Sequence, residues 1–410
     1  MAPSDYRPFL PTQSKIAGPT ARAHAEARLK SPRAQELFGT WDQLLAEPYR
    51  GITTDGTVIP GLYALAPNGA PVAAMAEAAS ALLARLTPEQ RARSVFPIDS
   101  EMWRRWQNTE LYVEHYGLRL EEIPDALREA VLAVLRASLS ARGFGMTRDV
   151  MRLNRFLGDL VGGPAVLGEW SYIFCLFGVP SMTEPWGWQF FGHHLSLNCF
   201  VLGGQMVLSP TFMGAEPSYA DTGPFAGTAL FQDEERAGLA LMRSLAPEQQ
   251  RRAIVAHSMM GGDLPEGRRH FADNLHLGGA RQDNRIVPYE GIRANAFSPV
   301  QRRALLDLVA SYVAPLPDGP AKVRMEEVER HLADTHFCWI GGFDEASPFY
   351  YRVQSPVIFI EFDHHAGVFL TNAEPAKFHV HTIVRTPNGN DYGIDLLRLH
   401  YAQAPHHRAG

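Results

Sequence analysis

The chain has 410 residues, of which 46% are hydrophobic and 20% are charged, and its formal net charge is −6. This balance is typical of a soluble globular protein, and the lack of a long basic stretch argues against nucleic acid as a partner. The three cysteines form no CxxC pair, the apolar runs are too short to span a bilayer, and the N-terminus has no apolar signal core. We therefore expect a cytoplasmic protein without a thiolate zinc site or a membrane partner.

The first third of the chain reads as helical segments separated by proline-rich stretches. Residues 1–66 are rich in proline and polar side chains, and we expect an extension there with one helix at about 20–46. Residues 71–86 have the apolar spacing of a helix. Thr87 then has the signature of an N-cap in a capping box. A long amphipathic helix is predicted at 124–143.

The same order of features then recurs, which predicts a tandem duplication. The fold class we expect is α+β, with two halves, residues 67–235 and 236–401, related by a pseudo-twofold axis. Each half would be an antiparallel sheet meander packed with helices, both would form one compact unit, and a tail would follow at 402–410. The alternative is that proline-capped helices and aromatic strands recur in any large protein. The six matches are LTPEQRARSVF (86–96) with LAPEQQRRAIV (245–255), GLRLEEIP (117–124) with GIRANAFSP (291–299), the helix 124–143 with 298–313, FCLFG from Phe174 with FCWIG from Phe337, PWGWQFFGHHLSLN from Pro185 with PFYYRVQSPVIFIE from Pro348, and VLSPTFMG (207–214) with VRTPNGNDYG (384–393).

Polar residues differ between the matching halves. Phe337 and Pro348 both lie 163 residues after their counterparts, and this offset aligns Asn198 with Glu361. It also aligns the pair His193–His194 with Pro356–Val357. Residues that differ between halves of one scaffold are not required by that scaffold, which favours a role in a site.

The run FHVH places two histidines on one predicted strand. Residues i and i+2 of a strand point to the same face, so His379 and His381 would project together and could bind one metal ion. The alternative is that both are half-exposed on the solvent face of an edge strand.

A second pair of histidines lies in GHHLSLN. On a strand, His193 and His194 would point to opposite faces, so only one of them would join a shared metal site. The other would be a hydrogen-bonded structural histidine, or would lie in a loop where the strand begins. His270 and His276 are isolated in the sequence, and we expect structural roles for them.

The run IEFDHHAG supplies carboxylates. Glu361 and Asp363 share a strand face, and a buried carboxylate requires a metal, an arginine or a histidine as partner. We therefore expect Glu361 to be a metal ligand or a catalytic base. For His364 and His365 we expect a solvated loop at the strand end.

Aromatic and charged side chains near these runs are candidates for a substrate pocket. We expect substrate contacts from Trp186, Trp188 and Tyr351, although core packing is the alternative for most aromatic residues. Arg352 and Arg385 could each hold a carboxylate through paired hydrogen bonds, the alternative being salt bridges to Glu361 or Asp391. Glu216, in the loop FMGAEP, is a candidate general base.

Four long motifs resemble a known family. PWGWQFFGHHLSLN, LSPTFMGAEP, YYRVQSPVIFIEFD and FHVHTIVRTPNGNDYG are similar to the bacterial and fungal family of domain of unknown function 3500, over about residues 80–401. The resemblance implies one whole-chain domain and supplies no activity.

Together these patterns favour a metal-dependent enzyme. The expected ligands are His379 and His381 with His193 or His194, and the expected carboxylate is Glu361. We favour an iron- or copper-dependent oxidoreductase or oxygenase acting on a small organic substrate, for example a carboxylate-bearing one. The alternatives are a zinc-dependent hydrolase that uses metal-activated water, and a metal-free protein that binds a small organic anion.

Overall fold

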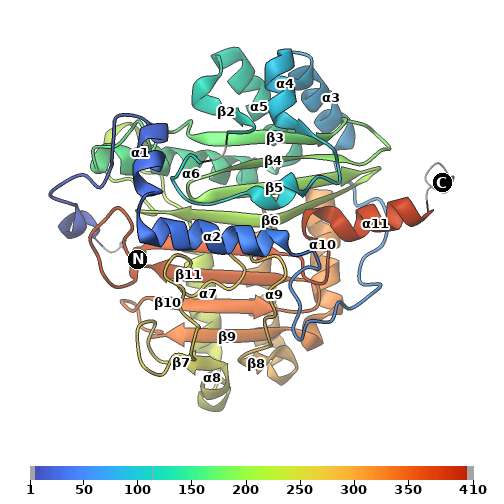
Figure 1. The fold of residues 1–410 in the computed structure, drawn as a ribbon. Helices are drawn as coiled ribbons and strands as arrows, with labels where there is room; N and C mark the ends of the chain where they lie inside the picture. Colours follow the sequence, from blue (N-terminus) through green and yellow to red (C-terminus); the bar gives the residue numbers. More distant parts are fainter. Residues whose placement is uncertain (1–4, 114, 404–410) are drawn as a thin grey trace.

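The computed structural model describes residues 5–113 and 115–403, and a twelve-stranded mixed sheet is its centre (Figure 1). The order along the sheet is β1-β3-β4-β5-β6-β12-β11-β10-β9-β7, with β2 paired to β3 and β8 to β9. The strands are β1 Val95–Phe96, β2 Leu118–Arg119, β3 Tyr172–Gly178, β4 Trp186–Gly192, β5 Leu195–Leu202, β6 Gln205–Ala215, β7 Ile254–Ala256, β8 Ile292–Arg293, β9 His336–Gly341, β10 Phe349–Gln354, β11 Phe359–His365 and β12 Ala376–Arg385.

Eleven α-helices accompany the sheet within the described residues, so the class is α+β, as predicted. None of them is both long and apolar enough to cross a membrane. The predicted tail comprises residues 402–410. Residues 402 and 403 are the last two residues of α11, and residues 404–410 lie outside the described residues. The helices are α1 Ala21–Arg28, α2 Pro32–Ala46, α3 Val72–Leu83, α4 Pro88–Ser94, α5 Asp125–Ser138, α6 Ala141–Leu160, α7 Gln232–Ser244, α8 Pro247–Ala253, α9 Pro299–Val313, α10 Asp318–Arg330 and α11 Ile394–Gln403.

Local signals set most helix boundaries, and two predicted helices are interrupted. Thr87 caps α4 in a capping box, as predicted. The predicted helix 20–46 is two helices because Ser31 caps a new N-terminus whose first residue is a proline. The predicted helix 124–143 likewise stops at Ser138, and Ser140 caps α6.

Strand pairing has the same register on both sides of the sheet. Cys175 lies opposite Gln189 between β3 and β4, and Cys338 lies opposite Arg352 between β9 and β10. At the edges, β1 runs parallel to β3, and β7 runs parallel to β9. The antiparallel pair β6–β12 therefore occupies the middle of the strand order, with one strand from each half of the chain.

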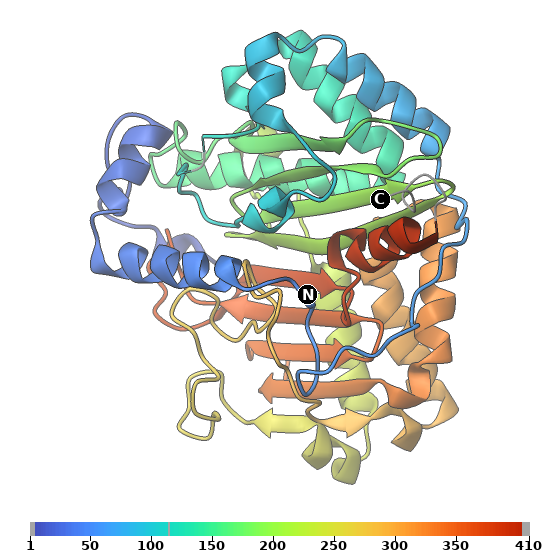
Figure 2. The ribbon, with the colours of Figure 1, turned by 45° about the vertical axis from the view of Figure 1, so that its right-hand side comes forward.

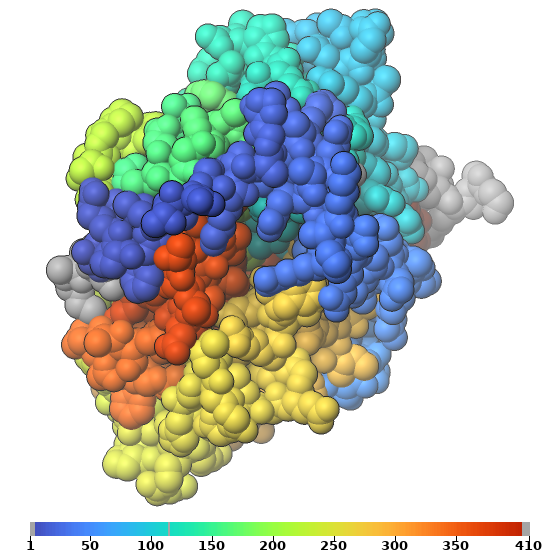
Figure 3. All heavy atoms as spheres, turned by 60° about the vertical axis from the view of Figure 1, so that its left-hand side comes forward, coloured from blue at the N-terminus to red at the C-terminus, as the bar shows by residue number. Residues whose placement is uncertain are grey.

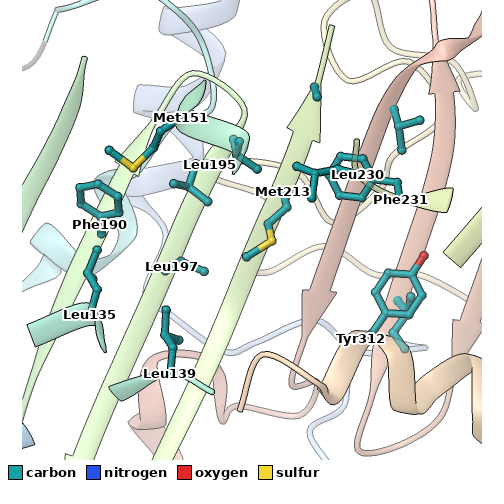
Figure 4. Close-up of a cluster of buried hydrophobic side chains, with 14 of the residues drawn as sticks. Leu135, Leu139, Met151, Phe190, Leu195, Leu197, Met213, Leu230, Phe231 and Tyr312 are labelled. Atoms are coloured by element: carbon teal, nitrogen blue, oxygen red, sulfur yellow. The ribbon is translucent and has the colours of Figure 1, made fainter. Parts of the chain in front are cut away.

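One face of the sheet is covered by helices and is apolar. Figure 2 shows helices from both halves of the chain behind the strands. Figure 4 shows part of this core, in which Leu135 of α5 and Met151 of α6 face Phe190 and Leu195 of the sheet. The other face, which we call the front face, carries α2 across its centre (Figure 1) and is rich in buried polar side chains. Successive side chains along a strand point to opposite faces of the sheet, so every second residue of a strand lies on the same face.

Candidate metal centre

Three imidazoles meet on the front face at the middle of the sheet. His379 Nε2 lies 3.1 Å from His381 Nε2 and 3.4 Å from His194 Nε2. All three side chains are buried, and these three nitrogens form the one group of His, Cys, Asp or Glu ligand atoms in the described chain that is compact enough to hold a metal ion. Two of the histidines come from β12 and one from the turn between β4 and β5.

The backbone brings these rings together in two ways. His379 and His381 share a face because they are two residues apart on β12, as the HVH run predicted. His193 and His194 form a two-residue turn, not the predicted strand, and His194 has φ 63°, a left-handed conformation that is uncommon outside glycine. Gly214 of β6 leaves room for the rings, because a Cβ there would lie 2.8 Å from His381 Cδ2.

The hydrogen bonds of His379 orient its lone pair toward the other imidazoles. Its Nδ1 lies 2.9 Å from the carbonyl oxygen of Ala366, which can only accept, so Nδ1 donates. The lone pair of neutral His379 is therefore on Nε2, which faces His194 and His381. His193 instead stacks on His194 with ring centroids 3.9 Å apart, and its Nδ1 bonds Asn154 at 2.7 Å.

Burial keeps these imidazoles neutral. Burial first, and the neighbouring histidines second, lower the pKa of His194, His379 and His381 well below the usual value. Burial also lowers the pKa of His193 to about 4. Neutral imidazole is the form that binds a metal ion, so the group is ready to do so at neutral pH.

The separations of His379 Nε2 from the other two nitrogens suit ligands of a single ion. Zinc–imidazole bonds are roughly 2.0–2.1 Å long, so a tetrahedral ion separates its ligand nitrogens by about 3.3 Å. The 3.1 and 3.4 Å separations lie close to that value. Hydrogen bonding explains the contacts less well, since unprotonated His379 Nε2 would have to accept from both neighbours at once.

Two histidines that the sequence analysis did not select lie beside the centre. His365, predicted to be solvated, is the last residue of β11, and its ring lies 4.3 Å from that of His381. Its Nδ1 is 2.9 Å from the same Ala366 oxygen that holds His379. His276, predicted to be isolated, lies 3.5 Å from Asp363 Oδ1 and packs near His381. The sequence does contain a signal for His365, because Glu361, Asp363 and His365 are spaced two residues apart and would share one face of a continuous strand.

Glu361 is not part of the group of three nitrogens, and its predicted role as a ligand or base stays a prediction. Its oxygens accept from the backbone N–H groups of Leu277 and Gly278 and from the hydroxyl of Tyr350 at 2.6 Å. Burial would raise the pKa of Glu361, but His276 and nearby arginines hold it below its usual value. This carboxylate therefore anchors the segment around Leu277 to the sheet.

Glu216 lies behind His379, where it cannot reach the open side of the centre. Its carboxylate accepts from the backbone N–H groups of residues 368–370, and Oε1 lies 3.8 Å from His379 Nδ1. Burial raises its pKa to about 6 against the lowering by these hydrogen bonds. The predicted general base is thus a group that fixes the loop whose Ala366 carbonyl orients the imidazole.

The two predicted substrate arginines are also internal. Arg385 bonds Asp283 at 2.8 Å, Asp391 at 2.9 Å and the carbonyls of Gly278 and Gly279, so the salt-bridge alternative holds. Arg352 lies on the front face, but its Nη2 bonds Glu290 at 2.9 Å, away from the histidines.

The predicted aromatic walls lie on the wrong face. Trp186, Trp188 and Tyr351 belong to the helix-side core, where Trp188 Nε1 donates to Ser138 and the Tyr351 hydroxyl bonds Tyr312. Their strand parity is opposite to that of the buried polar residues, so they cannot contact a ligand at the histidines.

The group of three histidines lies at a cleft of about 1000 Å³, whose lining includes His194, His365 and His381. Figure 3 shows this hollowed side, where the N-terminal helices (blue), the segment around residue 370 (orange-red) and the segment around residue 270 (yellow) come together. Leu37 and Trp41 of α2 contribute to one wall, so the predicted N-terminal extension is part of the cleft.

The cleft carries four basic side chains, Lys15, Arg28, Arg33 and Arg269. Within the described chain none of them pairs with a carboxylate. Lys15 donates to the carbonyls of residues 368 and 370, Arg33 to that of Phe271, and Arg269 to the side-chain oxygen of Asn274. Three acidic side chains, Glu36, Glu110 and Asp273, line the same cleft, so basic side chains exceed acidic ones there by one.

Comparisons with known proteins identify a family without an activity. No curated protein and no solved structure matches this chain. One family model, described as Protein of unknown function (DUF3500), matches residues 68–394, which confirms the resemblance noted in the sequence. The chain belongs to this family.

Proposed function

We propose that the protein is a metal-dependent oxidoreductase that uses copper or iron on a small organic anion. The observation that carries the proposal is the convergence of three buried, neutral imidazoles, two of which, His194 and His381, line a large cleft. A metal held by three protein ligands keeps a further coordination position for a reactant. Copper or iron there would supply one-electron and dioxygen chemistry.

The surroundings favour redox chemistry over zinc-dependent hydrolysis. Hydrolysis by metal-activated water benefits from a nearby general base. Glu361 and Glu216 are the predicted bases, and the carboxylates of both accept hydrogen bonds from backbone N–H groups. The all-imidazole ligand set suits copper, iron and zinc alike, so the identity of the metal discriminates between the two functions.

The charge of the cleft supports an anionic substrate. Four basic and three acidic side chains line it, the basic ones form no ion pair among the described residues, and a bound divalent ion would add to the positive field. Guanidinium groups bind carboxylates through paired hydrogen bonds, so Arg33 and Arg269 at the mouth are the candidates for this contact. Trp41 offers an apolar surface beside them.

We also propose that the scaffold arose by tandem duplication, with halves at 67–235 and 236–401. Identical registers at the 163-residue offset in β3–β4 and β9–β10 support it, as does the parallel strand at each edge. A pseudo-twofold axis would then pass between β6 and β12, beside the three histidines.

The first test is elemental analysis of untagged protein, for the wild type and for the double variant His379→Ala/His381→Ala. We expect near-stoichiometric copper or iron in the wild type and none in the double variant. His257→Ala, an exposed histidine outside the centre, is the matched control and should keep its metal.

Two other results would change the assignment. Stoichiometric zinc that is lost in the double variant would favour the hydrolase. No metal in the wild type, even after metal is added back, would refute the metal centre. Binding of organic anions that is unchanged in chelator would then support a metal-free binding protein.

A further inference from the structure

A second site lies outside the metal centre, in the segment that covers the front face between β7 and β8. A pocket of about 160 Å³ is lined by two arginines, Arg268 and Arg285, and two glutamates, Glu266 and Glu290, together with Pro265, Gly267, Leu277 and residues 286–288. It is much smaller than the cleft above the histidines, and its size suits a group of a few heavy atoms.

Arg268 presents an unused binding edge at this pocket. Its side chain is only 4% exposed, and its Nη1 donates to the carbonyl of Leu275. Its Nε and Nη2 are buried without a hydrogen-bond acceptor in the described residues. These two N–H groups form one edge of the guanidinium, the edge that binds a carboxylate or phosphate through two parallel hydrogen bonds.

Arg285 adds a second unpaired guanidinium. Among the described residues no hydrogen bond or ion pair engages its side chain, and burial lowers its pKa. The third arginine of the group, Arg352, has its Nη2 on Glu290 and its Nη1 buried without an acceptor. Three guanidinium groups thus lie near three carboxylates, Glu266, Glu290 and Glu361, but within the described residues none of these carboxylates accepts a hydrogen bond from Arg268 or Arg285.

Glu290 forms a long ion pair with Arg268 but accepts no hydrogen bond from it. Its Oε2 lies 2.9 Å from Arg352 Nη2 but 4.0 Å from Arg268 Nε, beyond hydrogen-bond distance. A buried charged donor without an acceptor is costly, so an anion that supplied two oxygens to this edge would be bound favourably.

We propose that this pocket binds a small oxyanion, either free phosphate or the phosphate or carboxylate group of an organic molecule, through Arg268 and Arg285. The same segment continues into residues 269–274, which line the cleft of the metal centre. Occupation of the pocket would therefore fix one wall of that cleft. The inference does not depend on the proposed function, because it uses none of the three histidines.

The test is isothermal titration calorimetry of the full chain with inorganic phosphate in a phosphate-free buffer. We expect one saturable equivalent, weakened by about tenfold or more in Arg285→Gln, because a charge-assisted contact is lost. Glu290→Gln, which removes a competing carboxylate without changing shape, should tighten binding several-fold. Arg251→Gln, at an exposed arginine of α8 that does not line the pocket, should leave phosphate binding unchanged.

Further titrations distinguish a phosphate from a carboxylate ligand, and distinguish this proposal from the proposed metal centre. Acetate and citrate, titrated in the same way, would identify a carboxylate group as the preferred ligand if they bind more tightly and are equally sensitive to Arg285→Gln. The double variant His379→Ala/His381→Ala should bind phosphate normally. Absence of saturable binding of all three anions, binding that Arg285→Gln leaves unchanged, or binding lost in the histidine double variant would each overturn the inference, whatever the metal content.

Discussion

Replacing Glu216 tests whether the metal centre depends on the loop behind it. This buried carboxylate accepts from three consecutive backbone N–H groups, Val368 to Leu370. The loop that it fixes contains Ala366, whose carbonyl oxygen holds the Nδ1 atoms of both His365 and His379. Glu216→Ala would release the loop, whereas Glu216→Gln keeps the shape and one acceptor oxygen.

The expected magnitudes follow from these contacts. A buried backbone donor left unpaired costs about 1–3 kcal/mol, so three of them would cost several kcal/mol. Either substitution also removes a charge whose burial is unfavourable. Since the pKa of Glu216 is raised from 4.5 to about 6, its ionised form destabilises the folded state by about 2 kcal/mol at neutral pH, and both variants recover this free energy. We therefore expect Glu216→Ala to lower the free energy of unfolding by about 3 kcal/mol and Glu216→Gln by about 1 kcal/mol. Metal affinity should fall by roughly 10–100-fold in Glu216→Ala, as for other groups that orient a ligand.

The pH dependence of the free energy of unfolding provides an independent test of the role of Glu216. The folded-state pKa of Glu216 is raised above its unfolded value of 4.5, so its contribution to stability is full below pH 4.5 and is lost as pH rises through about 6. Glu216→Gln should remove this loss. Urea unfolding of metal-free protein at several pH values measures stability, and competition with a chelator measures affinity.

The control is Glu326→Gln, in an exposed pair with Lys322 on α10, which should change neither quantity. Metal affinity within twofold of wild type in Glu216→Ala would refute the argument that Ala366 and its loop orient His379.

Three further predictions concern the scaffold. Gly238→Ala in α7 should destabilise the protein, because the new Cβ would lie 2.4 Å from buried Tyr351, whereas Gly145→Ala in α6 meets no atom within 4 Å and should stabilise it by up to about 1 kcal/mol; thermal unfolding compares them. Arg385→Lys should lower the free energy of unfolding by about 3 kcal/mol, since lysine cannot reach two aspartates and two carbonyls at once; a change below 1 kcal/mol in urea would contradict this. Without metal, the lowered pKa of His193, about 4 against 6.5 unfolded, should remove about 3 kcal/mol of stability as pH falls from 6.5 to 4, and thermal unfolding in chelator that is flat over this range would oppose it.

Strand parity explains which parts of the site could be predicted. The period of two is a property of the backbone, so the shared face of His379 and His381 followed from the sequence alone. The same rule applied to β11 would have placed His365 with Glu361, but the strand was expected to end too early. Element ends are set by tertiary contacts that a local pattern does not contain.

Strand alternation also explains why the tryptophans were wrongly predicted to line the substrate pocket. Trp186 and Trp188 alternate with Gln189, whose side chain bonds Asn198 on the front face, so the tryptophans belong to the opposite face. Sequence gives the alternation but not which face is covered by helices. The walls from α2 and from the segment around residue 270 depend on contacts between residues far apart in the chain, and so does the positive φ of His194.

The position of the metal centre connects the fold to the proposed function. The β6–β12 pair is the middle of the sheet and joins the two halves of the chain. His194 approaches it from the first half, and His379 and His381 from the second, across Gly214 of β6. Because the three histidines come from both halves, neither half alone can assemble the three nitrogens. In a duplicated fold, the two halves would contribute equivalent strands at this junction. The residues that differ between these strands are not needed by the shared fold, so they are free to form one asymmetric site. This accounts for histidines in a strand that could otherwise have been filled with aliphatic residues.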